Sequence, residues 1–304
     1  MTPVQGLRKV LLICQAQILA NVGPIASADF GPEHVHQLRV GLRRLRSGLR
    51  LFEGVFEGEV GGLLPSALAE LNQAAADLFR LLGGARDGDV LAGLWAPAVQ
   101  EALRAAGLEL AAASAMPTAA PLSLATPNVV EIVRAAPQQA MLAELARLIE
   151  QLAQPAARLR RSKSAPSAPK APSNAALLAL LRRRLLRWQA QVCEDAAGFA
   201  ELDMDGRHQL RKRLKRLRYG LEFYGQLWPA RRRPTTLKPL QQAQQVLGEL
   251  NDLALAINAS RADLTDNPQA WFALGWLSAR QQQLLDSALP VMQRLGETPP
   301  LWKS

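Results

Sequence analysis

HQLRVGLRRLRSGLRLF, residues 36–52, returns as HQLRKRLKRLRYGLEFY at residues 208–224. At this constant offset of 172 positions, ten of the 17 residues are identical, and the exchange of Arg43 for Lys215 keeps the positive charge. Self-similarity on this scale indicates a structural unit that occurs twice. The repetition predicts two copies of one helical unit, of roughly four helices each, related by a pseudo-two-fold axis.

Each copy shows two neighbouring stripes when it is placed on an α-helix. The first stripe is apolar, and its members are Leu38, Leu42, Leu45, Leu49 and Phe52 in one copy and Leu210, Leu214, Leu217, Leu221 and Tyr224 in the other. The second stripe is basic, and its members are His36, Arg39, Arg43, Arg46 and Arg50 in one copy and His208, Arg211, Lys215 and Arg218 in the other. Glu222 takes the place of the last Arg, and Arg44 and Arg216 point away as ordinary surface charges. We expect each basic stripe at the edge of a buried interface and both stripes facing one shared cleft.

The rest of the chain is also predicted to be helical. Only 15 of 304 residues are aromatic, and Leu and Ala dominate, which argues against a β-sandwich or barrel. We expect helices over 5–22, 33–54, 63–82, 88–114, 128–153, 174–197, 205–227, 235–262 and 268–294. The predicted fold is all-α, with two pseudo-symmetric four-helix bundles around a basic central pore or cleft. The expected domains are 1–154 and 174–296, separated by a Pro/Ser/Ala-rich basic linker at 155–173 and followed by a tail at 297–304.

The positive charge is concentrated in the repeated helices. The chain carries 36 Lys and Arg against 26 Asp and Glu, a net charge of +10. Residues 39–50 and 207–218 hold twelve of the basic residues and no acid, and the remaining 24 basic residues face 26 acids. Nine like-charge pairs at helical spacing would cost about 2–4 kcal/mol, because each costs roughly 0.2–0.5 kcal/mol. This pattern indicates an anionic partner, and the planar guanidinium group of Arg suits phosphate oxygens.

At these residues the chain resembles the CHAD family, helical domains that carry a His-x-x-Arg-x-x-x-Arg/Lys-Arg-x-Arg helix once in each four-helix half. The resemblance covers about residues 5–295 and includes the Gly–x–Asp turns, here matched by Leu82-Gly83…Asp87 and Leu247-Gly248…Asp252. It implies binding of inorganic polyphosphate in a basic pore and association with polyphosphate granules and their proteins. The implied polyphosphate-binding residues are the basic stripes: His36, Arg39, Arg43, Arg46, Arg50, His208, Arg211, Lys215 and Arg218.

The resemblance also implies what the chain lacks. Many such domains follow a CYTH triphosphatase domain with a Glu-x-Glu-x-Lys motif, but Glu57-Gly-Glu59 continues here with Val60 and Gly61. We therefore expect a stand-alone binding protein that is not an enzyme, has no catalytic residues and needs no cofactor. No Ser-His-Asp set, Walker loop or Rossmann fingerprint appears in the sequence.

Metal, disulfide and membrane functions are not favoured. Two cysteines, Cys14 and Cys193, cannot build a disulfide framework or a four-cysteine zinc site, and we expect both to be buried thiols. His34 and His36 diverge on a helix, whereas His36 and His208 could meet across the pseudo-axis and hold a metal with a carboxylate; hydrogen-bonded neutral histidines are the simpler expectation. The apolar stretch Val10–Ala20 is interrupted by Gln15 and Gln17, so we expect an amphipathic first helix, no membrane span and a cytoplasmic protein.

Other residues keep two interpretations. Asp87, Asp89 and Asp252 could bind Mg²⁺ or act as acid–base groups, but we expect Asp87 and Asp252 to accept from helix N-termini or pair with the stripe arginines. Trp271 and Trp276 are expected in the core, and the clusters Arg182–Arg184 and Arg231–Arg233 in solvent. The alternatives to polyphosphate binding are binding of nucleic acid or another polyanion, which the scarcity of aromatic residues disfavours, and processing of a phosphate polymer.

Overall fold

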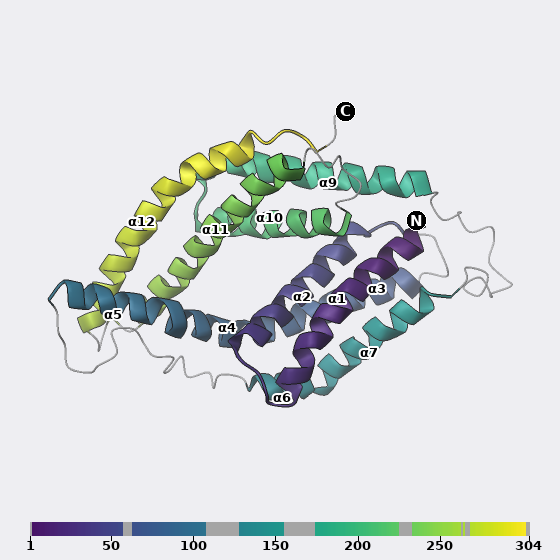
Figure 1. Cartoon of the computed structure of the whole chain (residues 1–304), viewed down its shortest axis with the longest axis horizontal. Helices are drawn as coiled ribbons and strands as arrows, with labels where there is room; N and C mark the ends of the chain where they lie inside the picture. Colours follow the sequence, from purple (N-terminus) through teal and green to yellow (C-terminus); the bar gives the residue numbers. More distant parts are fainter. Residues whose placement is uncertain are drawn as a thin grey trace. The chain divides into compact units, whose positions relative to one another are not determined.

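The structure is a computed structural model, and it describes residues 2–56, 63–107, 128–154, 174–224, 233–262, 264 and 268–301. Every regular element in these ranges is helical, which confirms the all-α prediction (Figure 1). The predicted linker at 155–173, Glu57, Glu59, Arg231 and Arg232 lie outside the described residues, as do 108–114, 225–227 and the last three residues of the tail.

The chain divides into two compact units. The first unit comprises residues 1–83, 127–187 and 219–225, and the second comprises 84–126, 188–218 and 226–304. The units interleave along the chain, because helices α9 (Asn174–Ala197) and α10 (Met204–Tyr224) each contribute to both. The two units therefore differ from the consecutive halves 1–154 and 174–296 that the sequence predicts. Those halves describe the internal repeat, and like the pseudo-two-fold axis they stay a prediction.

The described part of the first unit holds five helices besides its shares of α9 and α10. These are α1 (Pro3–Ala26), α2 (Pro32–Leu51), α3 (Leu63–Leu81), α6 (Val129–Arg134) and α7 (Ala136–Gln151). The single helix expected over 128–153 is interrupted at Ala135, whose backbone is extended (φ −61°, ψ 144°). Pro137 explains the break, since it has no N–H for the helical ladder and its ring would clash with the carbonyl of the preceding turn.

Two glycines bring α1 and α2 close together in this unit. A Cβ atom on Gly48 would lie 2.4 Å from Cγ1 of Val10, and one on Gly41 would lie 3.0 Å from Cγ1 of Ile18. A side chain at Gly48 would therefore displace α1. By length and composition α1 is also the one described helix that would suffice to cross a membrane. Here Leu7, Leu11 and Ile18 are completely buried in the first unit.

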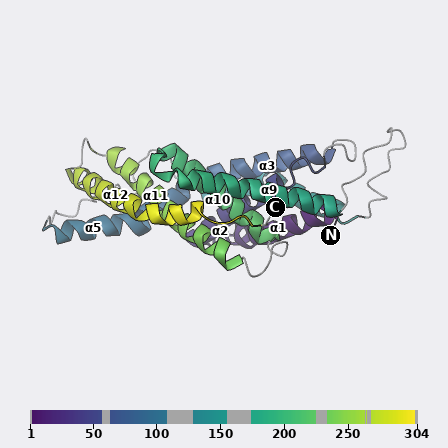
Figure 2. The same cartoon turned by 90° about the horizontal axis from the view of Figure 1, so that it is seen from above.

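The second unit is built on α11 (Arg233–Ala262) and α12 (Pro268–Gly296), which run side by side (Figure 2). Before them in the sequence come α4 (Gly83–Val90), the π-helical segment η2 (Leu91–Trp95), α5 (Ala96–Ala105) and the 3₁₀ turn η3 (Phe199–Glu201). The single helix expected over 88–114 is thus, within the described residues, an α-helix interrupted by a π-helical turn. The amide of Ala96 donates to the carbonyl of Leu91, five residues back, and this π turn directly precedes Pro97, which cannot donate.

The core of the second unit joins α5 to α11 and α12. Trp95, Val99, Leu253, Ile257 and Leu277 are each at most 7% exposed and form one cluster, against which Trp276 packs. The prediction that Trp271 belongs to the core is wrong, because this side chain is 61% exposed. It lies in the first turn of α12, which begins at Pro268.

Candidate functional site

The apolar stripes of the two repeated helices are confirmed as core. All ten of their side chains are buried, and the most exposed of them, Leu49, is only 6% exposed. Because each basic stripe lies beside its apolar stripe on the helix, burial of one holds the other at the border between core and solvent. We call the basic stripe of α2 the first basic face and the basic stripe of α10 the second basic face.

The first basic face lies in the first unit, and its arginines rest on α3. Nη1 of Arg39 donates to the carbonyl oxygen of Phe79, at 2.7 Å, and the Arg39 guanidinium lies 4.1 Å from the centre of the Phe79 ring. The guanidinium of Arg43 lies 5.0 Å from the centre of the same ring. The Phe79 carbonyl belongs to the last turn of α3, where carbonyls lack partners within the helix and the helix dipole favours a cation. Arg39 therefore has a fixed position, and its contact with the ring leaves it only half-buried.

Positive charge is crowded on this face. Burial lowers the pKa of Arg46, and the neighbouring charges of Arg50, Arg80 and Arg43 lower it further. Among the described residues, Arg43, Arg46 and Arg50 form no ion pair with an acid. Arg80, on α3, adds to the crowding, and the sequence analysis missed it because it lies outside the repeated stretch. Its own partner is Asp77, one turn earlier on the same helix.

The second basic face lies in the second unit and rests on α11. Nη1 of Arg218 donates to Oε1 of Gln244, at 2.7 Å. His208 is hydrogen-bonded to the side chain of Asn251. Burial lowers the pKa of His208, and Lys212 and Arg211 lower it further against the opposing effect of Asp205. His208 therefore favours its neutral form at neutral pH, as the sequence predicts.

A chain of polar contacts leads from His208 to α4. The amide nitrogen of Asn251 donates to Oδ1 of Asp252 at 3.3 Å, and the guanidinium of Arg86 lies 3.0 Å from the same oxygen. Arg86 also pairs with Asp87, at 3.4 Å. Asp87 and Asp252 therefore do pair with an arginine, but the expected partners, the stripe arginines, are wrong. Arg86, which follows the repeated Gly in sequence, joins both acids instead.

The arginines on the opposite side of the two helices are packing residues, which corrects the prediction of plain surface charges. Arg44 donates to Oε1 of Gln17 at 2.7 Å, lies 3.8 Å from the Glu222 carboxylate and 5.5 Å from the centre of the Phe223 ring. The guanidinium of Arg216 lies 4.8 Å from the Trp188 ring centre. Arg213, likewise, pairs with Asp195 of α9 at 2.6 Å. Partners from neighbouring helices thus relieve part of the repulsion within the repeated stretches.

Two further side chains close the ends of α2. Nη1 of Arg184, on α9, donates to the carbonyls of Arg50, Leu51 and Glu53 at 3.2, 2.8 and 2.8 Å. Arg184 is therefore not a solvated charge, as expected from its cluster, but a cap on the carbonyls at the C-terminal end of α2. At the other end, Nδ1 of His34 accepts from the amide of Gly31 at 3.0 Å. His34 thus has a structural partner at the start of the helix.

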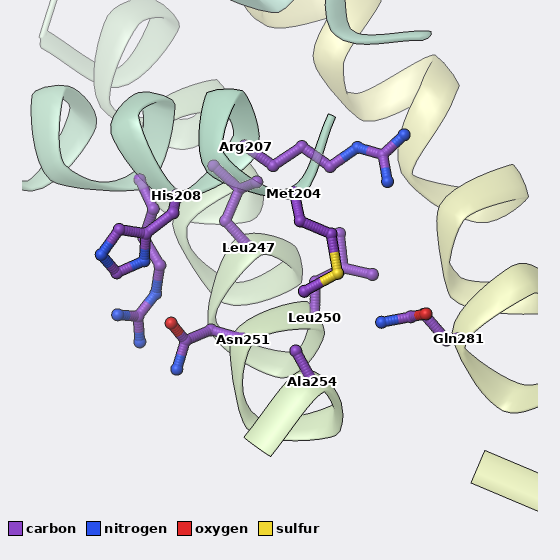
Figure 3. Close-up of a pocket in the computed structure, with 9 residues that line it drawn as sticks. Met204, Arg207, His208, Leu247, Leu250, Asn251, Ala254 and Gln281 are labelled. Carbon is purple, nitrogen blue, oxygen red and sulfur yellow. The ribbon is translucent and has the colours of Figure 1, made fainter. Parts of the chain in front are cut away.

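A pocket of about 80 Å³ opens beside the second basic face. Its polar side chains come from α10, α11 and α12, and they are Arg207, His208, Arg211, Asn251 and Gln281. Its apolar side chains are Met204, Leu247, Leu250 and Ala254. Figure 3 shows His208 and Gln281 on opposite sides of the pocket, with Asn251, Leu250 and Met204 between them. The sequence analysis did not find this pocket, because Met204, Ala254 and Gln281 belong to no motif.

The described ranges contain no cluster of metal-binding side chains. No three His, Cys, Asp or Glu side chains come together there to hold an ion. Cys14 is buried, as predicted. Cys193 is only partly buried, and its sulfur lies 3.4 Å from the carbonyl oxygen of Leu295.

The comparisons with known proteins agree with this fold. The model of the CHAD domain family matches residues 9–261. A crystal structure of the CHAD domain from the plant Ricinus communis superposes with a TM-score of 0.68 and 25% identity, over 99% of this chain and 95% of that one. PptA from Streptomyces chartreusis shares the fold, with a TM-score of 0.58 and 18% identity over 97% of this chain and 99% of the other.

None of these names is that of an enzyme. No curated protein sequence matches the chain. The family match nevertheless spans both repeated helices and most of the residues between and around them. On that match, and on a fold similar to a known CHAD domain over almost its whole length, this chain belongs to the CHAD domain family.

Proposed function

We propose that this protein binds inorganic polyphosphate through the first and second basic faces and does not transform it. The observation that carries the proposal is the position of the stripe arginines. All of them except the exposed Arg50 are held half-buried at the edge of the core by the apolar stripe beneath them, and Phe79 and Gln244 fix two of them. A row of guanidinium groups with fixed positions can contact successive phosphates of an extended polyanion.

The electrostatics of α2 support an anionic ligand. The pKa of Arg46 is lowered by burial and by three neighbouring arginines, so the positive charge of this group is less favourable here than in water. An anion bound along the first basic face would reverse that effect. Phosphate oxygens also supply the hydrogen-bond acceptors that the guanidinium groups need, and charge-assisted bonds of this kind are roughly twice as strong as neutral ones.

Polyphosphate fits the described residues better than nucleic acid. Proteins that bind single-stranded nucleic acid stack bases on exposed aromatic side chains. The two tyrosines of the repeated stretch, Tyr219 and Tyr224, are only 3% and 1% exposed. Phe79 is covered by the guanidinium groups of Arg39 and Arg43. The ring systems near the faces therefore hold arginines in place and are not offered to a base.

A processing enzyme has less support. Asp87 and Asp252, the acids of the two matched Leu-Gly…Asp stretches, are both paired with Arg86. A carboxylate held by a guanidinium is a weak base and a poor ligand for a catalytic cation. We accordingly propose a binding protein that is drawn to polyphosphate granules in the cytoplasm, with granule proteins as its neighbours.

Competition binding tests the proposal. Labelled long-chain polyphosphate is displaced by unlabelled polyphosphate or by DNA of equal phosphate content, at one salt concentration. We expect polyphosphate to compete at least tenfold better, and equal competition would indicate a general polyanion binder. Arg50→Ala and Lys215→Ala should each weaken binding, whereas the matched control Arg261→Ala, an exposed arginine at the end of α11, should not. Loss of affinity in the control alone would contradict the assignment of the faces.

A further inference from the structure

The pocket beside the second basic face has a composition that the rest of that face lacks. It combines three nitrogen-rich side chains, Arg207, His208 and Arg211, with two amides and a set of apolar residues, and no acid lines it. The lining comes from three helices of one unit, so the cavity is a feature of the folded second unit rather than of a single helix end. A cavity that gathers cationic donors without an acid favours an anionic group.

Arg207 lies outside both basic stripes and has donor capacity to spare. Its guanidinium lies 5.3 Å from the centre of the Phe199 ring, which holds the side chain in place. Its Nε is buried, and among the described residues this nitrogen has no hydrogen-bond partner. Arg207 also lines the pocket, where its guanidinium group can donate to an anion. Figure 3 shows the Arg207 side chain extending past Met204, along the rim opposite Asn251.

The lining of the pocket bounds what can enter. Its volume of about 80 Å³ leaves room for a phosphoryl group. Leu247 and Leu250 form an apolar floor, and Gln281 of α12 bounds the side away from His208. A polyphosphate chain that entered past His208 would therefore meet α12 with its first unit.

We propose that this pocket binds the terminal phosphoryl group of a polyphosphate chain, whose following units lie along the second basic face. The proposal rests on the proposed function, and it adds a preference for chain ends to it. The terminal group differs from interior units because it carries a second ionisable oxygen, with a pKa near 6 in comparable phosphate esters, and so gains charge near neutral pH. Arg207 and Arg211 can neutralise this extra charge, and the amide of Gln281 can donate to an oxygen at the closed side.

Two variants and a matched control test the pocket. Gln281→Ala removes the amide at the closed side, and Ala254→Leu fills the cavity from α11. Gln283→Ala is the control, because it removes the same side chain two positions further along α12, where it is exposed. Each variant is compared with the wild-type chain by isothermal titration against tripolyphosphate, which is rich in ends, and against long-chain polyphosphate. Thermal unfolding by circular dichroism confirms that each variant is folded.

We expect Gln281→Ala to weaken tripolyphosphate binding about tenfold, the loss expected for one charge-assisted hydrogen bond. Ala254→Leu should weaken it at least as much, because the added side chain occupies the space of the terminal phosphoryl group. Binding of long chains, expressed per phosphate, should change less than threefold, and Gln283→Ala should change neither. Long chains with both terminal phosphates blocked as amides should bind the wild-type chain and Gln281→Ala equally. Unblocked chains of the same length should distinguish the two proteins.

The outcomes separate this inference from the proposed function. If long chains bind and tripolyphosphate affinity is the same in Gln281→Ala, Ala254→Leu and Gln283→Ala, the end-binding pocket is refuted while the basic faces stand. Orthophosphate that binds the wild-type chain as tightly as tripolyphosphate does would also refute it, because the pocket would then hold free phosphate rather than a chain end. If no polyphosphate of any length binds, the proposed function itself fails.

Discussion

Arg43 and Arg44 are adjacent in sequence and equal in charge, yet the structure predicts opposite consequences for their removal. Arg44 makes a hydrogen bond to Gln17, a 3.8 Å ion pair with Glu222 and a ring contact with Phe223. These contribute about 1 kcal/mol, up to about 1 kcal/mol and about 0.5–1 kcal/mol respectively. Arg44→Ala should therefore lower the free energy of unfolding by about 1.5–3 kcal/mol and Tm by roughly 3–10 °C. Its affinity for polyphosphate should stay within about twofold, because Arg44 faces away from the first basic face.

Removal of Arg43 should instead weaken binding and leave the stability of the fold nearly unchanged. Its contact with the Phe79 ring, at 5.0 Å, is worth about 0.5–1 kcal/mol. Its removal also relieves repulsion with Arg39 and Arg46, at roughly 0.2–0.5 kcal/mol for each pair, so the stability of the fold should hardly change. Loss of a charge-assisted hydrogen bond to phosphate should weaken binding about tenfold or more.

The assay for this pair is isothermal titration with long-chain polyphosphate at one salt concentration, together with thermal unfolding of the free proteins. Equal losses of affinity for Arg43→Ala and Arg44→Ala would refute the reasoning, because they would show that only the general positive field matters. An unchanged Tm in Arg44→Ala would show that its three contacts contribute nothing. A binding defect in Arg43→Ala that arose only from unfolding would appear as a lowered Tm.

Three further predictions follow from the same contacts. The pKa of His208 lies below its ordinary value of 6.5, and a bound phosphate should raise it. Affinity for polyphosphate should therefore increase as pH falls through the region below neutrality. Binding titrations at a series of pH values should show a weaker pH dependence in His208→Gln. In the free protein the sign is opposite, and the depressed pKa of His208 should cost stability as pH falls. Arg184→Ala removes the cap on the last carbonyls of α2 and should lower the free energy of unfolding by about 1–3 kcal/mol in denaturant titration, whereas Arg182→Ala, on the same helix, serves as its comparison. Affinity for polyphosphate should fall on the order of a thousandfold between 50 and 200 mM salt if six to nine phosphates are contacted, and a shallow salt dependence would contradict binding along both faces.

The repeated helices were predictable because their information is local. A period of 3.6 residues separates the apolar stripe from the basic one within a single helix, and burial of Leu38, Leu42 and Leu210 follows from that pattern alone. Most helix bounds agree with the expected ranges within a few residues, since caps and breakers lie close to the ends they determine. The breaks at Ala135 and before Ala96 were also present in the sequence, as Pro137 and Pro97, but their weight against a strong helical pattern was underestimated.

The partners of charged side chains were not predictable, because they come from distant parts of the chain. Arg184 caps a helix 134 positions earlier, and Arg86 reaches an acid 166 positions later. A charge run such as Arg182–Arg184 looks uniform in sequence, although one of its members is fixed by three carbonyls. The exposure of Trp271 has the same origin, since only the packing of α12 decides which of its aromatic residues meet α11.

The structure also shows where the cost of the repeated charges is carried. Arg44, Arg213 and Arg216, on the packed side of their helices, have an acid or an aromatic ring as partner, so their part of the like-charge repulsion is offset within the protein. On the stripe side the contacts are of another kind: a ring and a carbonyl hold Arg39 in place, and an amide holds Arg218. Arg43 and Arg46 form no ion pair with an acid among the described residues. Fixing an arginine in advance reduces the rotamer entropy that a ligand must overcome, and a guanidinium group that no acid neutralises keeps its attraction for an anion. The packed side of each repeated helix therefore stabilises the fold, and the stripe side holds its arginines in position to bind an anion.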